Sequence, residues 1–257
     1  LQLHRLRVEE FGARRRQGSV SFLVPERRPQ REMLDEAGLP TEEVERSLAD
    51  IRWINRFWGG HRVARSAVLG AIVSAGRPQT LLDLGSGSTD VPIDLARRAA
   101  RRGVRLEVFS LDVQVAHLAT ARGIYGKNAP ALVAGDAKRT PFPDASFDWV
   151  ISAQFFHHFS PEENVGILRE MARLARRGLF VLDLRRHAVA RLAVIGLGPF
   201  LFRSGITKVD ARMSVEQAYT PAEVGEIARR AGLSGIAVRA APPFRLVLSA
   251  LSPPSGE

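Results

Sequence analysis

The feature that most constrains the fold of this chain is an alternation of short apolar segments with amphipathic ones between residues 80 and 184. The apolar segments have the length of buried strands: 80–84, 106–111, 131–134, 147–152 and 179–184. The amphipathic stretches among them have the apolar spacing of helices: 91–102, 115–123 and 161–176. Short apolar strands that alternate with helices predict an α/β fold whose parallel sheet is covered on both faces.

Polar residues gather at the ends of these predicted strands. In parallel sheets the ligand binds at the carboxyl ends of the strands, near the point where the strand order reverses. The residues that occupy this place in the chain are 83–90, 112, 136, 152–158 and 183–187. We therefore expect the functional site to be built from them.

The turn after the first strand, LDLGSGSTD, argues against a phosphate ligand. A dinucleotide fingerprint carries a third glycine and places the pyrophosphate at the N-terminus of the next helix. Here Gly85 and Gly87 supply two glycines, but Asp90 stands in the third place. Its carboxylate would repel a diphosphate and suits a cationic or zwitterionic ligand; the alternative is that Asp90 caps the following helix.

Two further acids follow the next two strands. Asp112 stands where a carboxylate can accept hydrogen bonds from both hydroxyls of a ribose, with a cap for the helix at 115–122 as the alternative. Asp136 stands where a carboxylate can accept a hydrogen bond from an exocyclic amine, while backbone groups of Ala137 read an adenine edge. Ribose, adenine and a charged amino-acid tail together describe S-adenosylmethionine.

Four stretches in register resemble the class I S-adenosylmethionine-dependent methyltransferases, and among them the ubiquinone/menaquinone biosynthesis branch. They are DLGSGSTD, LDVQ, GDAKRTPFPDASFDWVISAQFFHHF and REMARLARRGLFVLDLRRH. The resemblance covers residues 65–250 and implies a Rossmann-like, doubly wound sheet of seven strands. That sheet is mostly parallel and has an antiparallel C-terminal edge, here at 236–240 and 245–250. Upstream, RSLADIRWINRFWGGHR resembles a subset of bacterial methyltransferases often encoded near type III polyketide synthases.

The resemblance, together with the acid at the third glycine place, gives a set of candidate cofactor-binding residues. Most of them directly follow a predicted strand: Asp83, Gly85, Gly87, Asp90, Asp112, Val113, Asp136, Ala137 and Gln154. In the family, the glycine-rich loop wraps the methionine part of the cofactor, and the acid after the second strand holds the ribose. The family often has glycine where this chain has Thr89, which puts the cofactor affinity in question.

The implied chemistry is an in-line displacement, for which the protein mainly orients the reactants and excludes water. A general base helps when the acceptor is a phenol, an enol or an alcohol. His157 and His158 follow the fourth strand and are the catalytic candidates, although one ring could simply pack within the loop. No metal is expected, because adjacent histidines should point apart and no third ligand stands out.

The acceptor pocket is predicted from three parts of the chain. Arg185 and Arg186 follow the fifth strand and could grip an acidic group, or they could be solvated. Phe155 and Trp58 are further substrate candidates. A lid insertion at about 188–219 supplies apolar residues that line a greasy pocket or pack in the core: Leu192, Ile195, Leu197, Phe200, Leu201 and Phe202.

The chain divides into three parts. Residues 1–30 are rich in arginine and lack a helix or strand period, which predicts a flexible arm or a strap over the surface. Residues 31–76 form a helical cap, with helices predicted from 31, from Thr41 to the stop at Gly59, and over 61–75. Residues 77–257 form the cofactor-binding domain.

The net charge of +10 permits nucleic-acid binding, but the arginines are dispersed as pairs without interleaved aromatic residues, so nucleic acid is not expected as a partner. There is no cysteine, which excludes disulfides and thiolate metal sites, and no signal peptide is visible, so a cytoplasmic protein is expected. The apolar run 188–202 is too short and interrupted to span a bilayer. The sequence is also compatible with peripheral membrane contact and with a homodimer.

The expected function is methylation, at an oxygen or else at a carbon, of a small apolar acceptor of aromatic, polyketide or quinone type. One alternative is an RNA or protein methyltransferase, although amino-group enzymes usually show a polar-Pro-Pro-aromatic motif where this chain has SAQFFHHF. The other alternative is a non-catalytic cofactor-binding partner protein.

Overall fold

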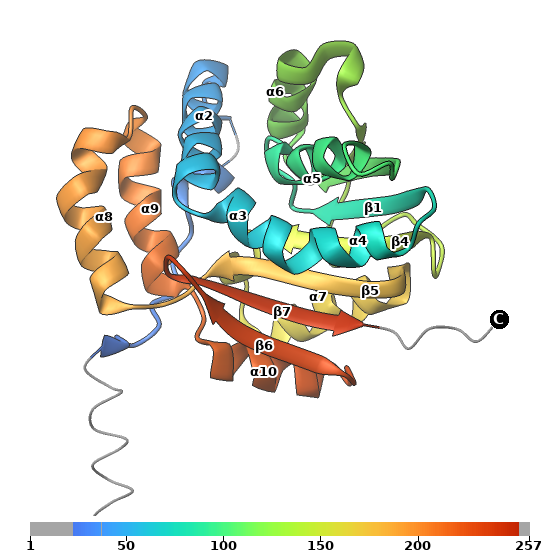
Figure 1. Cartoon of the computed structure of the whole chain (residues 1–257). Helices are drawn as coiled ribbons and strands as arrows, with labels where there is room; N and C mark the ends of the chain where they lie inside the picture. The colour runs from blue at the N-terminus through green and yellow to red at the C-terminus, as the bar shows by residue number, and fades with distance from the viewer. Residues whose placement is uncertain (1–22, 37, 252–257) are drawn as a thin grey trace, which may run out of the picture.

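A seven-stranded sheet forms the centre of the molecule, which is described for residues 23–36 and 38–251 in a computed structural model (Figure 1). The strand order is β3-β2-β1-β4-β5-β7-β6; β7 pairs antiparallel with both β5 and β6, and the other pairs are parallel. This confirms the doubly wound sheet with an antiparallel C-terminal edge. The strands are β1 (Gln79–Leu84), β2 (Leu106–Asp112), β3 (Ala131–Ala134), β4 (Phe147–Ala153), β5 (Ala175–Leu184), β6 (Ile236–Ala241) and β7 (Arg245–Leu251).

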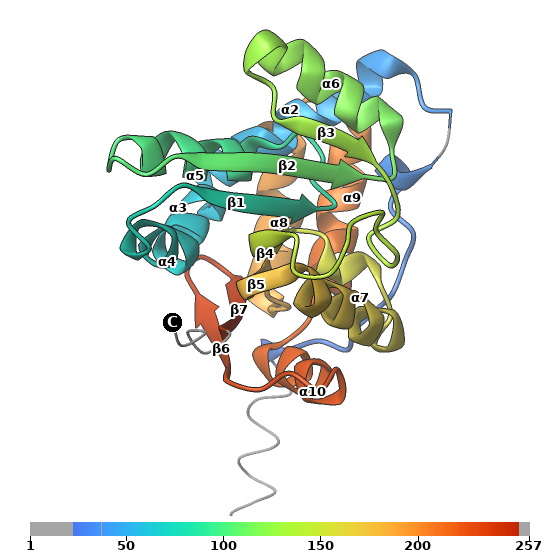
Figure 2. The ribbon, with the colours of Figure 1, turned by 90° about the vertical axis from the view of Figure 1, so that its right-hand side faces the viewer.

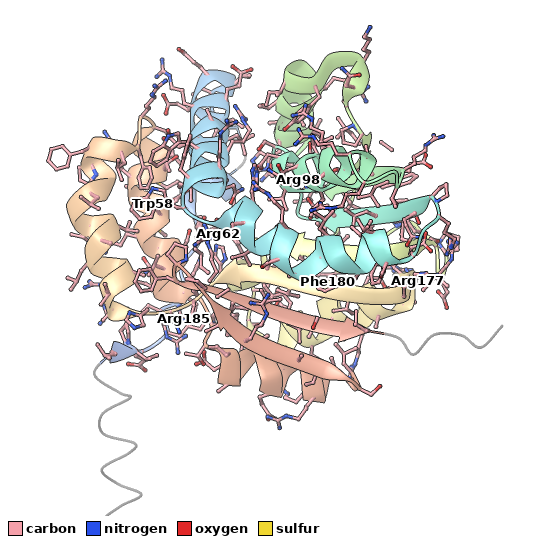
Figure 3. All side chains as sticks on the ribbon, viewed as in Figure 1. Trp58, Arg62, Arg98, Arg177, Phe180 and Arg185 are labelled. Atoms are coloured by element: carbon pink, nitrogen blue, oxygen red, sulfur yellow. The ribbon has the colours of Figure 1, made fainter. Side chains whose placement is uncertain are left out.

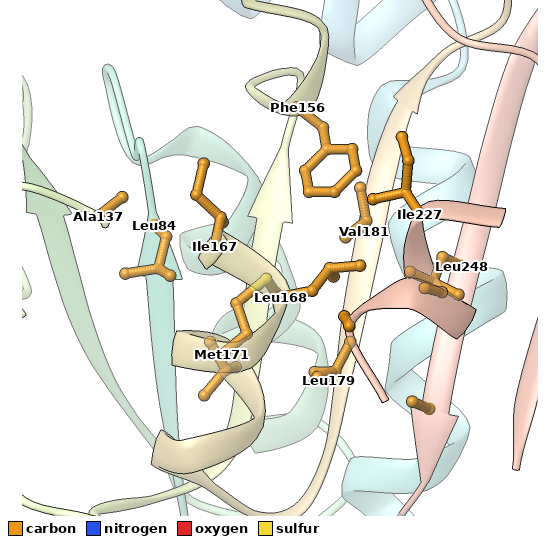
Figure 4. Close-up of a cluster of buried hydrophobic side chains, with 14 of the residues drawn as sticks. Leu84, Ala137, Phe156, Ile167, Leu168, Met171, Leu179, Val181, Ile227 and Leu248 are labelled. Carbon is orange, nitrogen blue, oxygen red and sulfur yellow. The ribbon is translucent and has the colours of Figure 1, made fainter. Parts of the chain in front are cut away.

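Helices cover both faces of the sheet (Figure 2). One face packs on α7 (Pro161–Leu174) and α10 (Pro221–Arg230), and Figure 4 shows Leu168 and Met171 of α7 close to Leu179 and Val181 of β5. The other face packs on α5 (Asp90–Ala100) and on the segment that precedes β1. A further helix, α6 (Val115–Tyr125), connects β2 to the short helix η3 (Gly126–Asn128) before β3.

Local sequence signals explain where these helices begin. Both α7 and α10 start with a capping box and a proline in the first turn: Ser160 and Thr220 each accept a backbone N–H, and a glutamate three residues later reaches back. The end of α7 was predicted less well. The chain leaves the helix after Leu174 and enters β5 at Ala175 rather than at 179, because Ala175 already pairs with Phe147 of β4.

The N-terminal region places helices next to the site. It contains α2 (Thr41–Phe57), α3 (Gly60–Ala64), the π-helical turn η2 (Arg65–Leu69) and α4 (Gly70–Ser74). The helix predicted from residue 31 is wrong, since only the single turn η1 (Met33–Asp35) forms there. The reason is tertiary: the backbone N–H groups of Met33 and Leu34 donate to the carboxylate of Asp210, at 2.9 Å each.

We call residues 23–36 the strap, because they are bonded across the domain rather than free of it. Arg28 donates its backbone N–H to the carbonyl of Glu216 at 3.1 Å, and the Arg27 guanidinium donates to the carbonyls of Gln217, His157 and Phe159. In the described part of the predicted arm, the chain therefore forms a strap over the surface rather than a flexible arm. Residues 1–22 of that arm lie outside the described residues.

The lid insertion forms a helical hairpin beside α2, at the end of the molecule toward which β1, β4 and β5 point (Figure 1). Its helices are α8 (Ala188–Leu201) and α9 (Gly205–Gln217), and Ser204 caps α9. None of the helices within residues 23–36 and 38–251 has the length and apolar character that crossing a membrane requires.

Candidate active site

A large cavity opens at the carboxyl ends of the parallel strands. Its walls come from the strap, from α2, from the turns after β1, β2 and β4, and from the lid helices α8 and α9. One end is acidic and lies against the turn after β1. Another part is apolar, and the strap contributes to a second group of titratable side chains that line the cavity.

Three carboxylates form the acidic end: Asp83, Asp90 and Asp112. Asp83 is only 2% exposed, and its Oδ1 atom has no hydrogen-bond partner among the described residues. Burial raises the pKa of Asp83 well above its usual value, and the nearby charges of Asp90 and Asp112 raise it further. A cationic ligand would offset this repulsion and supply the missing partner, whereas a phosphate would add to it.

Asp90 is held by side chains rather than by the helix that it begins. Its Oδ2 atom lies 2.8 Å from Nε2 of His61, and its Oδ1 atom accepts from Ser88 at 3.3 Å. The N-cap of α5 is Thr89, so the capping alternative for Asp90 is wrong. Thr89 has a φ of 56°, a left-handed conformation that glycine adopts more easily. The loop thus has a backbone conformation typical of glycine at this position, although the residue is threonine.

Asp112 ties two turns together at the mouth of the cavity. Its Oδ2 atom accepts the backbone N–H of Gly87 at 2.8 Å, and its Oδ1 atom accepts that of Gln114 at 2.8 Å. Gln114 is the N-cap residue of α6, so this bond fixes the residue before the helix and does not cap the amides of its first turn. Each carboxylate oxygen has a second lone pair, which leaves Asp112 able to accept from a ligand as well.

The position of Gly85 requires glycine, because its backbone conformation and its close neighbour leave no room for a side chain. Its φ is 68°, and a Cβ atom built there would lie 2.1 Å from Cδ2 of Phe155. The Phe155 ring therefore packs directly on the glycine turn, and it also lines the cavity. The predicted cofactor loop and the predicted acceptor residue meet at this contact.

The structure brings most of the remaining predicted residues to the cavity, but not all of them. Val113, Gln154 and Trp58 line it, and Gln154 donates a hydrogen bond to Asn55 of α2. Within the described residues that line the cavity, Asp136 and Ala137 are not found. Asp136 is exposed and accepts from the backbone of Lys138, and Ala137 is buried in the core. An adenine-reading role for this pair stays a prediction.

His157 and His158 lie at the strap end of the cavity in the short helix η4 (Phe156–His158). Their rings are stacked, with centroids 4.4 Å apart and an interplanar angle of 29°. The expectation that adjacent histidines point apart is therefore wrong here. Nδ1 of His157 lies 2.6 Å from Oδ1 of Asp183, and Nδ1 of His158 lies 2.8 Å from Oδ2 of Asp35. Both Nε2 atoms face Glu32, at 3.4 and 3.9 Å.

These contacts change the acid–base behaviour of His157 and Glu32. Burial alone would lower the pKa of His157, but the charges and hydrogen bonds of Asp183 and Glu32 outweigh it and raise that pKa to about 10. Burial likewise opposes ionisation of Glu32, but the two histidines lower its pKa to about 2. The carboxylates of Asp183 and Glu32 thus favour the charged, imidazolium form of His157.

The predicted substrate contact by Arg186 is wrong, because structural bonds consume its guanidinium. It donates to the carbonyls of Pro25 and Ala218, at 2.7 and 2.6 Å, and to the Glu223 carboxylate at 2.6 Å. Arg186 is 5% exposed, and neither it nor Arg185 is among the described cavity-lining residues. Arg186 instead fastens the strap to the chain before α10.

Arg186→Ala is therefore expected to destabilise the fold rather than weaken substrate binding. It would remove the donor to the partly buried carbonyl of Pro25 and to the buried carbonyl of Ala218, and it would break the ion pair with Glu223, so we expect a loss of about 3 kcal/mol in the free energy of unfolding. Urea unfolding measures this, with Arg185→Ala as the neighbouring control. A fully stable Arg186→Ala protein with a raised acceptor KM would contradict this assignment.

Sequence reasoning missed several residues of the site. Glu32 and Asp35 stand in a charge-dense segment, and nothing local distinguishes them from solvated acids. Arg245 is 4% exposed and lines the cavity from the start of β7, where the pattern indicated only a strand. Asp183 does stand in the range 183–187 that the sequence placed at the site, but no role was predicted for it.

Comparison with known proteins agrees with this arrangement. Residues 82–182 match the family model described as Methyltransferase domain. The demethylmenaquinone methyltransferase of Thermotoga maritima is 36% identical over 108 residues, which are 41% of this chain and 43% of that protein. Ajmaline N-methyltransferase of Rauvolfia serpentina is 29% identical over 109 residues, 42% of this chain and 36% of that protein.

These alignments span less than half the length of either curated relative. Among solved structures, a SAM dependent methyltransferase from Aquifex aeolicus superposes with a TM-score of 0.56 at 18% identity, over 83% of this chain and 98% of that one. At this identity the likeness shows the fold, and it extends over most of the chain.

Proposed function

We propose that this chain, whose residues 82–182 form a class I S-adenosylmethionine-dependent methyltransferase domain, methylates a hydroxyl oxygen of a small, largely apolar acceptor. The observation that carries the proposal is the continuity of the cavity. The acidic turn after β1, apolar side chains of α2 and the lid, which we call the chamber, and the Glu32, His157 and His158 side chains all line this one cavity. A cofactor and an acceptor can therefore meet in one water-poor space.

The acidic end suits the cofactor. Asp83 and Asp90 would face the charged methionine part, and Asp112 would accept hydrogen bonds from the ribose hydroxyls. When bound, S-adenosylmethionine supplies a methyl group on a positively charged sulfur. Phe155, whose ring packs on Gly85, and Gln154 line the same cavity, and they would help to fix where the acceptor approaches the methyl group.

The chamber suits an apolar acceptor. Its walls carry aliphatic side chains of α2 and of the lid, among them Ile51, Ile54, Val194, Leu197, Leu201 and Phe202. Of the lid residues predicted to line the pocket, Leu197, Leu201 and Phe202 do so. Leu192, Ile195 and Phe200 are instead exposed on α8, which leaves peripheral membrane contact as a prediction.

A hydroxyl is favoured over an amine by the polar end of the chamber. An oxygen acceptor must lose a proton to become a good nucleophile, and the Glu32, His157 and His158 cluster is where the protein can assist that loss. An RNA acceptor is less well supported. The arginines labelled in Figure 3 come from different parts of the chain: Arg62 from α3, Arg98 from α5, Arg177 from β5 and Arg185 from the segment after β5.

The test uses labelled S-adenosylmethionine with alkylphenols, hydroxypyrones, quinols and total RNA as acceptors. We expect the label on the oxygen of an apolar hydroxyl compound. Leu201→Glu, which puts a carboxylate into the chamber, should lower kcat/KM for that acceptor about tenfold or more without weakening S-adenosylhomocysteine binding. The matched control is Leu192→Glu, on the exposed side of the same helix.

Label found only in RNA would contradict the proposed acceptor class. Equal losses in Leu201→Glu and Leu192→Glu would show that the chamber does not hold the acceptor.

A further inference from the structure

We propose that Glu32, His157 and His158 form a binding site for a divalent transition-metal cation at the acceptor end of the cavity. The three side chains offer two imidazole nitrogens and a carboxylate, and these ligand atoms all lie within 4.8 Å of one another. The Nε2 atom of His157 is 3.4 Å from Oε1 of Glu32, a separation typical of two ligands that share one small cation.

Both histidines are already oriented as metal ligands usually are. Metal-binding imidazoles almost always donate the other ring N–H to a carboxylate or carbonyl, which fixes the tautomer and turns the second nitrogen toward the metal. Asp183 takes this place for His157 at 2.6 Å, and Asp35 takes it for His158 at 2.8 Å. Two such pairs converge here, and the stacking of the rings keeps both Nε2 atoms on the side of Glu32.

Glu32 is held in place from behind. Its Oε1 atom accepts from the Ser214 hydroxyl at 2.6 Å and from the Gln217 amide at 2.7 Å, and the residue is 6% exposed. Oε2 faces His158 at 3.9 Å. Oε1 also faces Nε2 of His157 at 3.4 Å, so each oxygen of this buried and fixed carboxylate is turned toward one imidazole, as in a preorganised ligand.

The charge of the cluster also favours a cation. Three carboxylates, those of Glu32, Asp35 and Asp183, contact the two imidazoles. A divalent cation held by the imidazoles and Glu32 would balance part of this negative charge. A set of two nitrogens and one carboxylate suits Zn²⁺ and its neighbours, whereas Mg²⁺ prefers an all-oxygen set.

The catalytic consequence rests on the proposed function. The cluster lines the cavity, so a coordination position not filled by protein can face the acceptor. There the cation would lower the pKa of the acceptor hydroxyl, whose proton passes to solvent. The oxygen then forms a bond to the methyl carbon as the bond from that carbon to sulfur breaks, which leaves the methyl ether and a neutral thioether.

The test is metal binding by the full chain after EDTA treatment and dialysis. We expect calorimetry to show one Zn²⁺ bound per chain and no comparable binding of Mg²⁺. Glu32→Gln should weaken Zn²⁺ binding at least tenfold, and Asp183→Asn should weaken it about 10- to 100-fold. Glu36→Gln, an exposed acid on the same strap, is the matched control and should bind as the wild type does.

A second readout is the visible spectrum of the wild-type protein with Co²⁺, where low-coordinate ligation by nitrogen gives absorption bands that aqueous Co²⁺ lacks. This readout needs no variant. The proposal is overturned if Zn²⁺ does not bind, if Glu32→Gln binds it as tightly as the wild type, or if Co²⁺ keeps its aqueous spectrum. S-adenosylhomocysteine binding by the EDTA-treated protein reports separately on the cofactor end, so failure of the metal site leaves the proposed function testable.

Discussion

His158→Ala is expected to lower kcat by on the order of 10²- to 10⁴-fold, with the acceptor KM and the affinity for S-adenosylhomocysteine changed little. The His158 ring lies at the acceptor end of the cavity, and its Nδ1 atom is fixed by Asp35 at 2.8 Å. Its Nε2 atom is therefore available to a proton or to a cation next to the acceptor oxygen. Steady-state kinetics with a hydroxyl acceptor measure the effect.

The control for this variant is His187→Asn. His187 lies outside the described cavity-lining residues and accepts the backbone N–H of Val189 at the start of α8, a role that asparagine can keep. Its kcat should stay close to that of the wild type. If His158→Ala retained full turnover, His158 would have no part in the chemistry.

Asp112→Ala is expected to raise the dissociation constant of S-adenosylhomocysteine roughly tenfold or more. The substitution removes a ribose acceptor, and it also frees the backbone N–H groups of Gly87 and Gln114, which Asp112 holds at 2.8 Å each. The two turns that shape the acidic end then lose their common anchor. Asp112→Asn keeps the size and one acceptor oxygen, so its effect should be smaller.

Calorimetric titration compares these variants with Glu107→Ala, an exposed acid on the same strand. Glu107→Ala should bind the ligand as the wild type does. An unchanged dissociation constant in Asp112→Ala would remove Asp112 from the cofactor site.

The sheet and its helices could be predicted because their signals are local. Burial of a strand or of a helix face leaves a periodic apolar pattern, and the ends of α7 and α10 carry capping residues. The acids at the carboxyl ends of β1 and β2 could also be predicted, since a parallel sheet brings these ends to one edge. Asp83, Asp90 and Asp112 do meet there.

The strap and the histidine cluster could not be predicted, because they depend on contacts between distant residues. Glu32 is fixed by Ser214 and Gln217, which lie 182 and 185 positions further along the chain. A contact between residues so far apart leaves no periodic pattern in the sequence. The carboxylate next to His157 and His158 could therefore not be predicted. For Arg186 the sequence predicted a contact that the structure does not contain. A charged residue at the end of a strand suggested a substrate-binding group, but its guanidinium donates to backbone carbonyls of the protein.

The most direct test of the account is a calorimetric titration of the wild-type chain with S-adenosylhomocysteine and with NAD⁺. The central claim is that Asp83, Asp90 and Asp112 shape a cleft for an adenosyl ligand that carries no phosphoryl group. We predict one S-adenosylhomocysteine bound per chain and no measurable binding of NAD⁺. Binding of NAD⁺ in competition with S-adenosylhomocysteine, or no response to either compound, would contradict it.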